Sequence, residues 1–356
     1  FKENFYRLCL NIAKNNNIIW AYDDFQDILK TNVQDEKLLF GKIEGTEEFY
    51  IDFDSIENSS DHDIILKKCY RNSKKILTGA FSLGMGVYNE VNEENIGIKV
   101  LQRIETKRGW EDIGFEVLNG NCQEGEKMLI TRPDKNSPDY KEEFLENSML
   151  NFSVCENIQE ECQIISDKII EDLRQDLRPE DICVICLDNM NINDYYNYLI
   201  QLLHDRGIKT FNLQNTISTN VRFTREDCIT LSSIYKAKGN EAGSDYIMGV
   251  DSIFKSSDDV YERNKLFTAI TRSKGWVYIT GTGEVAQKCK NEIELLLIND
   301  NNFNFFQPSG DTVRTIKQMS GRINKKKDLL SKNLREIAQE LGLSVEEYIK
   351  QYLLKE

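Results

Sequence analysis

The chain has 356 residues, of which 29% are charged and 40% are hydrophobic. At about 150 residues per domain this length predicts two domains, and the composition excludes a disordered, collagenous or membrane-spanning chain. The formal net charge is −14, so the surface as a whole repels phosphate groups, and a nucleic acid would have to meet a local basic lining.

Cysteine and histidine usage limits the chemistry further. The nine cysteines are an odd number without the dense spacing of a secreted disulfide framework, so we expect a soluble, cytoplasmic protein that binds no membrane. Cys183 and Cys186 form a C-x-x-C within the apolar run 182–187, and this run predicts a buried strand. A zinc site is not expected, because no second cysteine pair stands at the spacing that zinc binding requires. With only two histidines, a His-rich metal site or a Ser-His-Asp triad is not expected.

The first ordered feature is an apolar run at residues 17–22 that ends directly in Asp23, Asp24 and Asp27. This pattern predicts a buried strand with carboxylates at its carboxyl tip, which is where parallel α/β sheets place ligand sites. The sequence is mostly polar from residue 30 to about 61, which indicates a domain boundary.

A helical pattern follows over residues 63–75, and an apolar stretch with three glycines continues it to residue 88. The glycine spacing does not fit a phosphate-binding turn. Short strand-like segments at 113–118 and 127–131, separated by polar turns, predict a small β-rich insertion between residues 95 and 150.

From residue 151 the pattern alternates between helix and strand, which predicts a doubly wound parallel sheet. We expect helices at 151–177, 194–206 and 257–273, the second closed by Gly207, and strands at 182–187, 208–211, 228–234, 246–250 and 277–280. Two amphipathic tail helices are expected at 329–341 and 345–354, with the lysines at 325–327 as a solvated helix start.

Three motifs and one dipeptide carry the chemistry, and their order is the signal. Asp23-Asp24-Phe25-Gln26-Asp27 comes first and Tyr70-Arg71 second; residues 230–242, ending in Lys236-Ala237-Lys238-Gly239-Asn240-Glu241-Ala242, and residues 264–273, ending in Ala269-Ile270-Thr271-Arg272-Ser273, follow. Together they resemble the ATPase core of superfamily 1, UvrD-like helicases: the D-E-x-Q-D Walker B element, the Y-R of the fourth motif, the K-G-x-E of the fifth and the T-R-A/S of the sixth.

The resemblance implies a RecA-like α/β fold of the P-loop NTPase type. Residues 1–60 would be the end of a first motor domain carrying Walker B. Residues 61–315 would be a complete second motor domain with its insertion at about 90–150, and residues 316–356 a helical tail.

The resemblance also implies roles in ATP hydrolysis. Asp23 would hold Mg²⁺, and Asp24 would position the attacking water or accept its proton. Gln26 would sense the γ-phosphate, which Arg71 and Arg272 would approach as arginine fingers. The family has glutamate where this chain has Asp24, so the carboxylate here is one methylene shorter.

Two further groups of residues take implied binding roles. Tyr70 would stack on the adenine, Glu241 would accept hydrogen bonds from the ribose, and Lys238 and Gly239 would complete the nucleotide site. Single-stranded nucleic acid, DNA rather than RNA, would lie along a second group consisting of Ser232, Ser233, Tyr235 and Lys236.

Parts of the family pattern are missing from the sequence. No G-x-x-x-x-G-K-[S/T] occurs in the 356 residues, and we expect this Walker A loop upstream of Phe1. The third motif, G-D-x-x-Q, is unrecognisable between Ile28 and Asp61. An alternative is therefore a nucleotide-gated, helicase-like switch or scaffold with weak hydrolysis that serves a protein partner such as a nuclease. A structural α/β protein that matches by accident is the third interpretation, with Arg71 and Arg272 as ordinary surface arginines.

Overall fold

In the computed structural model, the chain consists of two compact units. Unit 1 comprises residues 1–22, 33–65 and 317–356, and unit 2 comprises residues 23–32 and 66–316. The structure describes residues 3–28, 36–53, 55, 64–89, 100–138, 149–216, 222–255, 260–310 and 313–316, together with 334, 337, 341 and 343–348. The assignment of residues 1–60 and 61–315 to two motor domains stays a prediction.

Unit 1 is built around α1 (Glu3–Ile12) and α2 (Glu36–Phe40), with the short 3₁₀ helix η1 (Lys14–Asn16) between them. Its small core consists of Leu10, Leu39 and Phe40. The predicted strand at 17–22 is wrong, since these residues have no regular secondary structure and Ile19 is 99% exposed. A strand needs a partner for its backbone groups, and the isolated bridge found among the described residues joins Lys42 to Phe49 instead.

Unit 2 contains a six-stranded parallel sheet, which confirms the predicted RecA-like, doubly wound α/β class. The strand order is β4-β9-β8-β5-β7-β6, with all neighbouring pairs parallel. The bounds are β4 (Leu150–Cys155), β5 (Ile182–Cys186), β6 (Lys209–Asn212), β7 (Cys228–Ser233), β8 (Ala242–Met248) and β9 (Ser273–Thr282).

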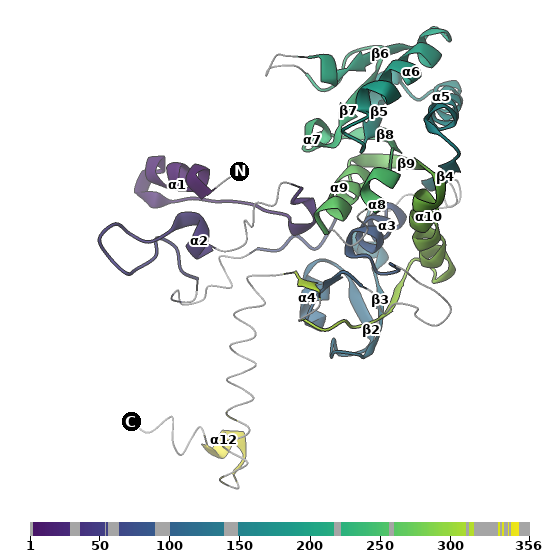
Figure 1. The fold of residues 1–356 in the computed structure, drawn as a ribbon. Helices are drawn as coiled ribbons and strands as arrows, with labels where there is room; N and C mark the ends of the chain where they lie inside the picture. The colour runs from purple at the N-terminus through teal and green to yellow at the C-terminus, as the bar shows by residue number, and fades with distance from the viewer. Residues whose placement is uncertain are drawn as a thin grey trace. The chain divides into compact units, whose positions relative to one another are not determined.

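Helices cover both faces of this sheet (Figure 1). Along β5, Ile182, Val184 and Cys186 pack on one side with α5 (Ile158–Arg174) and α6 (Ile192–His204). Cys183 and Ile185 pack on the other side, as the period-2 alternation of a strand requires. The helices on that side are α3 (Lys74–Met85), α8 (Asp251–Phe254), α9 (Val260–Ile270) and α10 (Gly283–Ile298), and α7 (Ile234–Ala237) follows β7 directly.

Two expected helices are misplaced. Residues 64–73 form no helix, because α3 begins after Ser73, whose hydroxyl accepts from the Ile76 amide at 3.3 Å as the N-cap. The expected helix at 151–177 is instead the edge strand β4 followed by α5. The Asn157 side chain caps α5 by accepting from the Glu160 amide at 3.0 Å.

The predicted β-rich insertion is a three-stranded antiparallel sheet of order β10-β3-β2. β3 (Lys127–Thr131) occupies the predicted residues and β2 (Glu116–Asn119) is displaced toward the C-terminus, with α4 (Lys107–Asp112) before it. The third strand, β10 (Phe303–Phe306), comes from much later in the chain. A two-residue parallel pair joins β1 (Gln102–Arg103) to β11 (Arg314–Thr315).

The C-terminal segment is described only in part. α12 (Val345–Tyr348) falls within one predicted tail helix, whereas the lysines at 325–327 and most of the other helix lie outside the described residues. None of the helices that the structure describes is long and apolar enough to cross a membrane.

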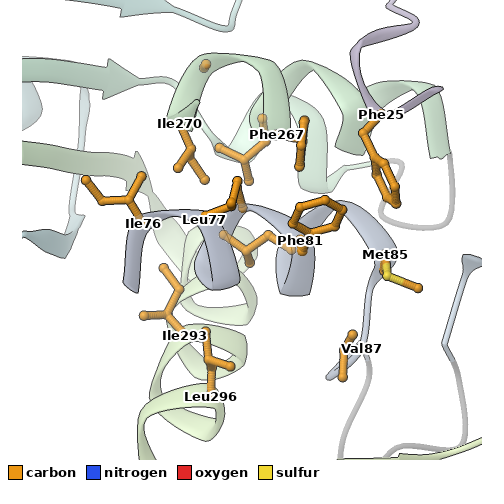
Figure 2. Packing of buried hydrophobic residues seen from close by; sticks show 14 of the residues in the cluster. Phe25, Ile76, Leu77, Phe81, Met85, Val87, Phe267, Ile270, Ile293 and Leu296 are labelled. Atoms are coloured by element: carbon orange, nitrogen blue, oxygen red, sulfur yellow. The ribbon is translucent and has the colours of Figure 1, made fainter. Parts of the chain in front are cut away.

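Phe25 ties the acidic motif at residues 23–27 to the core of unit 2. Its side chain is 5% exposed and contacts Phe81 of α3 and Phe267 of α9, with ring centroids 4.7 and 5.1 Å away. Figure 2 shows the three rings in the layer between these two helices. The motif is therefore held by aromatic packing rather than by strand pairing.

Replacing Phe25 with alanine should reduce the free energy of unfolding by about 3 to 5 kcal/mol, because a buried phenylalanine is truncated in a packed site. Phe306→Ala is the matched control, since Phe306 is 40% exposed, and its effect should stay near 1 kcal/mol or below. Urea denaturation followed by circular dichroism measures both. Equal losses for the two variants would contradict the anchoring role of Phe25.

A buried acid lies at the carboxyl end of the parallel sheet. Glu161 of α5 is fully buried and accepts hydrogen bonds from the Gly249 amide and the Thr280 hydroxyl, both at 2.7 Å. Desolvation raises the pKa of Glu161 to about 7 and outweighs those hydrogen bonds, and the nearby charge of Asp251 raises the pKa further.

Because the folded-state pKa of Glu161 is raised above its ordinary value, the native state binds more protons between pH 4.5 and about 7. Stability should therefore fall as pH rises through this window and recover on acidification. Glu161→Gln should remove this contribution, whereas Glu284→Gln, at an exposed position of α10, should preserve it. Chemical denaturation at pH 5.5 and 8 measures the difference, and parallel pH profiles for wild type and Glu161→Gln would contradict the assignment.

Candidate functional site

The acidic motif forms one turn of 3₁₀ helix, η2 (Asp24–Gln26), with Asp23 as its N-cap. One Asp23 carboxylate oxygen accepts from the Phe25 amide at 3.0 Å and the other from the Gln26 side-chain amide at 2.7 Å. The carboxylate of Asp23 is thereby fixed in direction by its own turn.

Helix α9 holds this turn through its backbone. The side-chain amide of Asn264, which is completely buried, donates to the carbonyls of Asp24 and Asp27 at 3.1 and 3.2 Å. Together with Phe25 in the core, these bonds fix the turn against α9.

Gln26 joins the acidic turn to Arg272. Its amide nitrogen donates to Asp23 at 2.7 Å, and its amide oxygen accepts from the Arg272 guanidinium at 3.1 Å. The guanidinium also donates to the Thr268 carbonyl at 3.0 Å, and Arg272 is only 4% exposed. Gln26 therefore connects Asp23 to Arg272, which lies almost 250 residues later in the sequence. We call this pair of hydrogen bonds the Gln26 bridge.

A second group of charges surrounds Glu241. The carboxylate of Glu241 accepts from Arg71 at 2.7 Å and pairs with Lys274 at 3.2 Å, and these partners lower its pKa despite partial desolvation. Lys238 donates to the Gln26 carbonyl at 2.8 Å. Gly239 between them has a φ of +92°, a backbone conformation that favours glycine.

The electrostatics of the two groups are linked. Burial lowers the pKa of Arg272 to about 10, and the nearby charge of Arg71 lowers it further, against the opposing charges of Asp245, Asp23 and Glu241. Two guanidinium groups placed close together repel each other, and an anion bound between them would relieve that repulsion. The site is thus suited to a phosphate group.

The acids of the site do not balance its cations. Although solvent reaches the Asp23 side chain, surrounding protein atoms desolvate it and raise its pKa, against the Gln26 and Phe25 hydrogen bonds and the charges of Arg272 and Lys238. Asp245 of β8 is completely buried, and desolvation raises its pKa to about 8. Near neutral pH, protonation of Asp245 leaves the positive charge of Arg272 less compensated.

Asp24 forms an ion pair with a residue outside the sequence motifs. Its carboxylate lies 2.6 Å from the guanidinium of Arg314 in β11, and the two side chains are 9% and 23% exposed. This guanidinium also lies 5.3 Å from the ring centre of Tyr261 and 3.4 Å from the side-chain oxygen of Gln102.

The remaining predicted residues make none of the contacts described above. Tyr70 is 82% exposed, with Lys68 over its ring at 5.3 Å. Ser232 and Ser233 are buried in β7, where the Ser232 hydroxyl donates to the Ser233 carbonyl at 3.0 Å, so a nucleic acid cannot reach the Ser232 hydroxyl in this conformation. The side chains of two further predicted residues are exposed on α7: Tyr235, 44% exposed, and Lys236, which donates to the Leu213 carbonyl at 2.5 Å.

Sequence reasoning missed four residues of the site: Asn264, Thr268, Lys274 and Arg314. Asn264 and Thr268 lie one turn apart in α9, and Arg272 follows four residues later, just beyond the end of the helix at Ile270. This regular spacing is a signal that could have found the first two. Arg314 carries no such signal, because it lies in a strand pair of only two residues.

No group of three or more His, Cys, Asp or Glu side chains that could hold a metal ion gathers among the residues the structure describes. This does not disagree with a nucleotide-bound magnesium ion, which needs only one or two protein carboxylates and takes its other oxygens from phosphates and water. Asp23 supplies a carboxylate that fits that requirement.

The comparisons with known proteins support the resemblance. Residues 229–280 match the family model of the UvrD-like helicase C-terminal domain, which includes β7, the K-G-x-E segment and the T-R segment. Among curated proteins, no sequence matches this chain.

Two solved structures are similar to parts of the chain at 14% identity each. The C-terminal domain of a possible DNA helicase from Lactobacillus plantarum aligns over 43% of this chain and 89% of its own, with a TM-score of 0.31. The helicase nonstructural protein 10 of an arterivirus aligns over 47% of this chain and 39% of its own, with a TM-score of 0.24.

The Gln26 bridge can be tested by titration. Gln26→Ala should raise the pKa of Asp23 further, because the hydrogen bond from Gln26 is the largest of the interactions that lower it. Carbon-13 NMR of aspartate carboxyls in wild type and variant measures the shift. Gln163→Ala, which removes a hydrogen bond to the exposed Asp167, should leave Asp23 unchanged, and an unshifted Asp23 in Gln26→Ala would contradict the bridge.

Proposed function

We propose that the chain is part of an ATP-dependent, UvrD-like helicase or translocase that acts on single-stranded nucleic acid. The observation that supports this most directly is the Gln26 bridge, which joins the carboxylate of Asp23 to the buried guanidinium of Arg272. The match of residues 229–280 to the UvrD-like helicase C-terminal domain also supports the proposal, because these residues include Glu241 and Arg272.

In this proposal, Arg272 and Arg71 stabilise the negative charge that develops on the γ-phosphoryl group during transfer. Their planar guanidinium groups match phosphate oxygens better than an ammonium group does. Gln26 contacts both Asp23 and Arg272. A γ-phosphate that contacts Gln26 would therefore affect the positions of both side chains. Glu241 would exchange part of its ion pairing for the ribose hydroxyls, and Tyr70 would stack on the base.

ATP and Mg²⁺ are the proposed cofactors, and the ion would neutralise charge between the β- and γ-phosphates when bound. Asp23 would hold it through its carboxylate. Asp24 would accept the proton of the attacking water as the oxygen attacks the γ-phosphorus and the bond to the β-phosphate oxygen breaks, releasing ADP. The Lys238 and Gly239 segment would border the nucleotide.

The proposed nucleic-acid partner is single-stranded DNA, contacted from α7. Tyr235 offers an exposed ring for stacking on a base, and Lys236 would exchange the Leu213 carbonyl for the phosphate backbone. A contact from the buried hydroxyl of Ser232 is not part of this proposal, and Ser233 would contribute only after a local rearrangement.

One observation favours a second candidate, a nucleotide-gated switch that binds ATP and hydrolyses it weakly while serving a protein partner such as a nuclease. Asp24 is one methylene shorter than the family glutamate, and its carboxylate is engaged by Arg314. Nucleotide binding without turnover, together with a stable protein partner, would select this candidate.

The natural full-length protein should hydrolyse ATP, and single-stranded DNA should stimulate the reaction. Arg272→Ala and Arg71→Ala should each lower kcat by about 10³-fold or more, the range known for arginine fingers, with a much smaller change in ATP affinity. Arg178→Ala, at an exposed ion pair, is the control and should retain turnover. Hydrolysis insensitive to DNA and to Arg272→Ala would count against the proposal.

A further inference from the structure

Arg314 is placed where it restrains the acid that the proposed hydrolysis uses. Its guanidinium lies 2.6 Å from an Asp24 carboxylate oxygen, which is the distance of a strong, charge-assisted hydrogen bond. An oxygen engaged in this way is a poor acceptor for a proton from water. The contact therefore opposes the role proposed for Asp24 as long as it persists.

Other residues orient both partners of the ion pair between Arg314 and Asp24. Gln102 is 1% exposed; its amide nitrogen donates to the Gly84 carbonyl at 2.8 Å, and this leaves its oxygen directed toward Arg314. Tyr261 of α9 presents its ring to the same guanidinium at 5.3 Å. The Asp24 backbone is held on α9 by Asn264.

The strand that carries Arg314 is short, although Ile316 directly after it is 7% exposed and packs in the core. β11 (Arg314–Thr315) pairs with β1 over only two residues, and unit 2 ends one residue later, at Ile316, where the chain passes into the C-terminal segment of unit 1. Few backbone hydrogen bonds must break for this strand to detach. Detachment of β11 would therefore separate Arg314 from the Asp24 carboxylate.

We propose that Arg314 is a clamp that holds Asp24 inactive, and that release of β11 frees Asp24 for hydrolysis. This inference rests on the proposed ATPase function. Single-stranded DNA would shift the equilibrium toward the released state by binding that state more tightly. Arg314 is thus a positioning residue that acts through Asp24.

The test uses the natural full-length protein with Arg314→Gln, Arg314→Lys, Asp24→Asn and the exposed control Arg178→Gln. ATP hydrolysis is measured with and without oligo(dT), and ATP affinity is measured with a fluorescent ATP analogue. Arg314→Gln should raise kcat without DNA by at least about fivefold, a typical coupling between linked sites, while KM and the DNA-saturated rate stay close to wild type. Arg314→Lys should raise it less, because the charge remains.

Asp24→Asn should abolish turnover in both the wild-type and the Arg314→Gln background, and Arg178→Gln should behave as wild type. A loss of turnover in Arg314→Gln both with and without DNA, or no change at all, would overturn the clamp. A purely structural role would lower kcat and thermal stability together and would not raise the DNA-independent rate.

Failure of the clamp differs from failure of the proposed function. If the wild-type protein binds the ATP analogue and is stimulated by DNA, but Arg314→Gln is not activated, only the clamp is wrong. If no variant binds the analogue or hydrolyses ATP, both the function and the clamp are wrong. Turnover that appears only in Arg314→Gln supports the clamp and identifies a wild-type protein that is strongly restrained.

Discussion

The insertion of Phe25 between α3 and α9 is the interaction on which the rest of the site depends. It places a five-residue acidic motif against α9, the helix that ends two residues before Arg272, without any strand to carry the motif. Once the ring is seated, Asn264 reaches the backbone of the turn and Gln26 reaches Arg272. Packing energy from one apolar side chain thus determines which charged groups meet.

The charged side chains of the site are each held by a polar or charged partner. Arg71 is held by Glu241, Arg272 by Gln26, and Asp24 by Arg314. In the proposed function, a nucleotide would engage the two arginines that these contacts now satisfy. Its binding would then be an exchange of partners rather than the filling of an unpaired site, and the strength of the contacts that it replaces would influence its affinity.

The sequence predicted the parallel sheet well because the buried strand β5 is a continuous apolar run, and helix α6 ends at His204, shortly before Gly207. It failed where tertiary context decides: residues 17–22 have strand composition but no neighbouring strand, and β4 is an edge strand that carries the polar residues Asn151 and Ser153. The ordered motifs predicted that Asp23 and Arg272 belong to one site, and the structure does bring them together. The contact of Arg314 with Asp24 was beyond prediction, since a single arginine in a two-residue strand carries no pattern.

The distance along the chain between the acidic turn and its partners affects how the protein is made. Asp24 and Arg314 are 290 positions apart, so at about 5 to 20 residues per second the ribosome needs roughly 15 to 60 s to supply the second after the first. Until α9 has been synthesised, the phenylalanine of the motif lacks its final pocket and exposes an apolar surface to other nascent chains. Slow translation before α9 is complete should therefore favour aggregation.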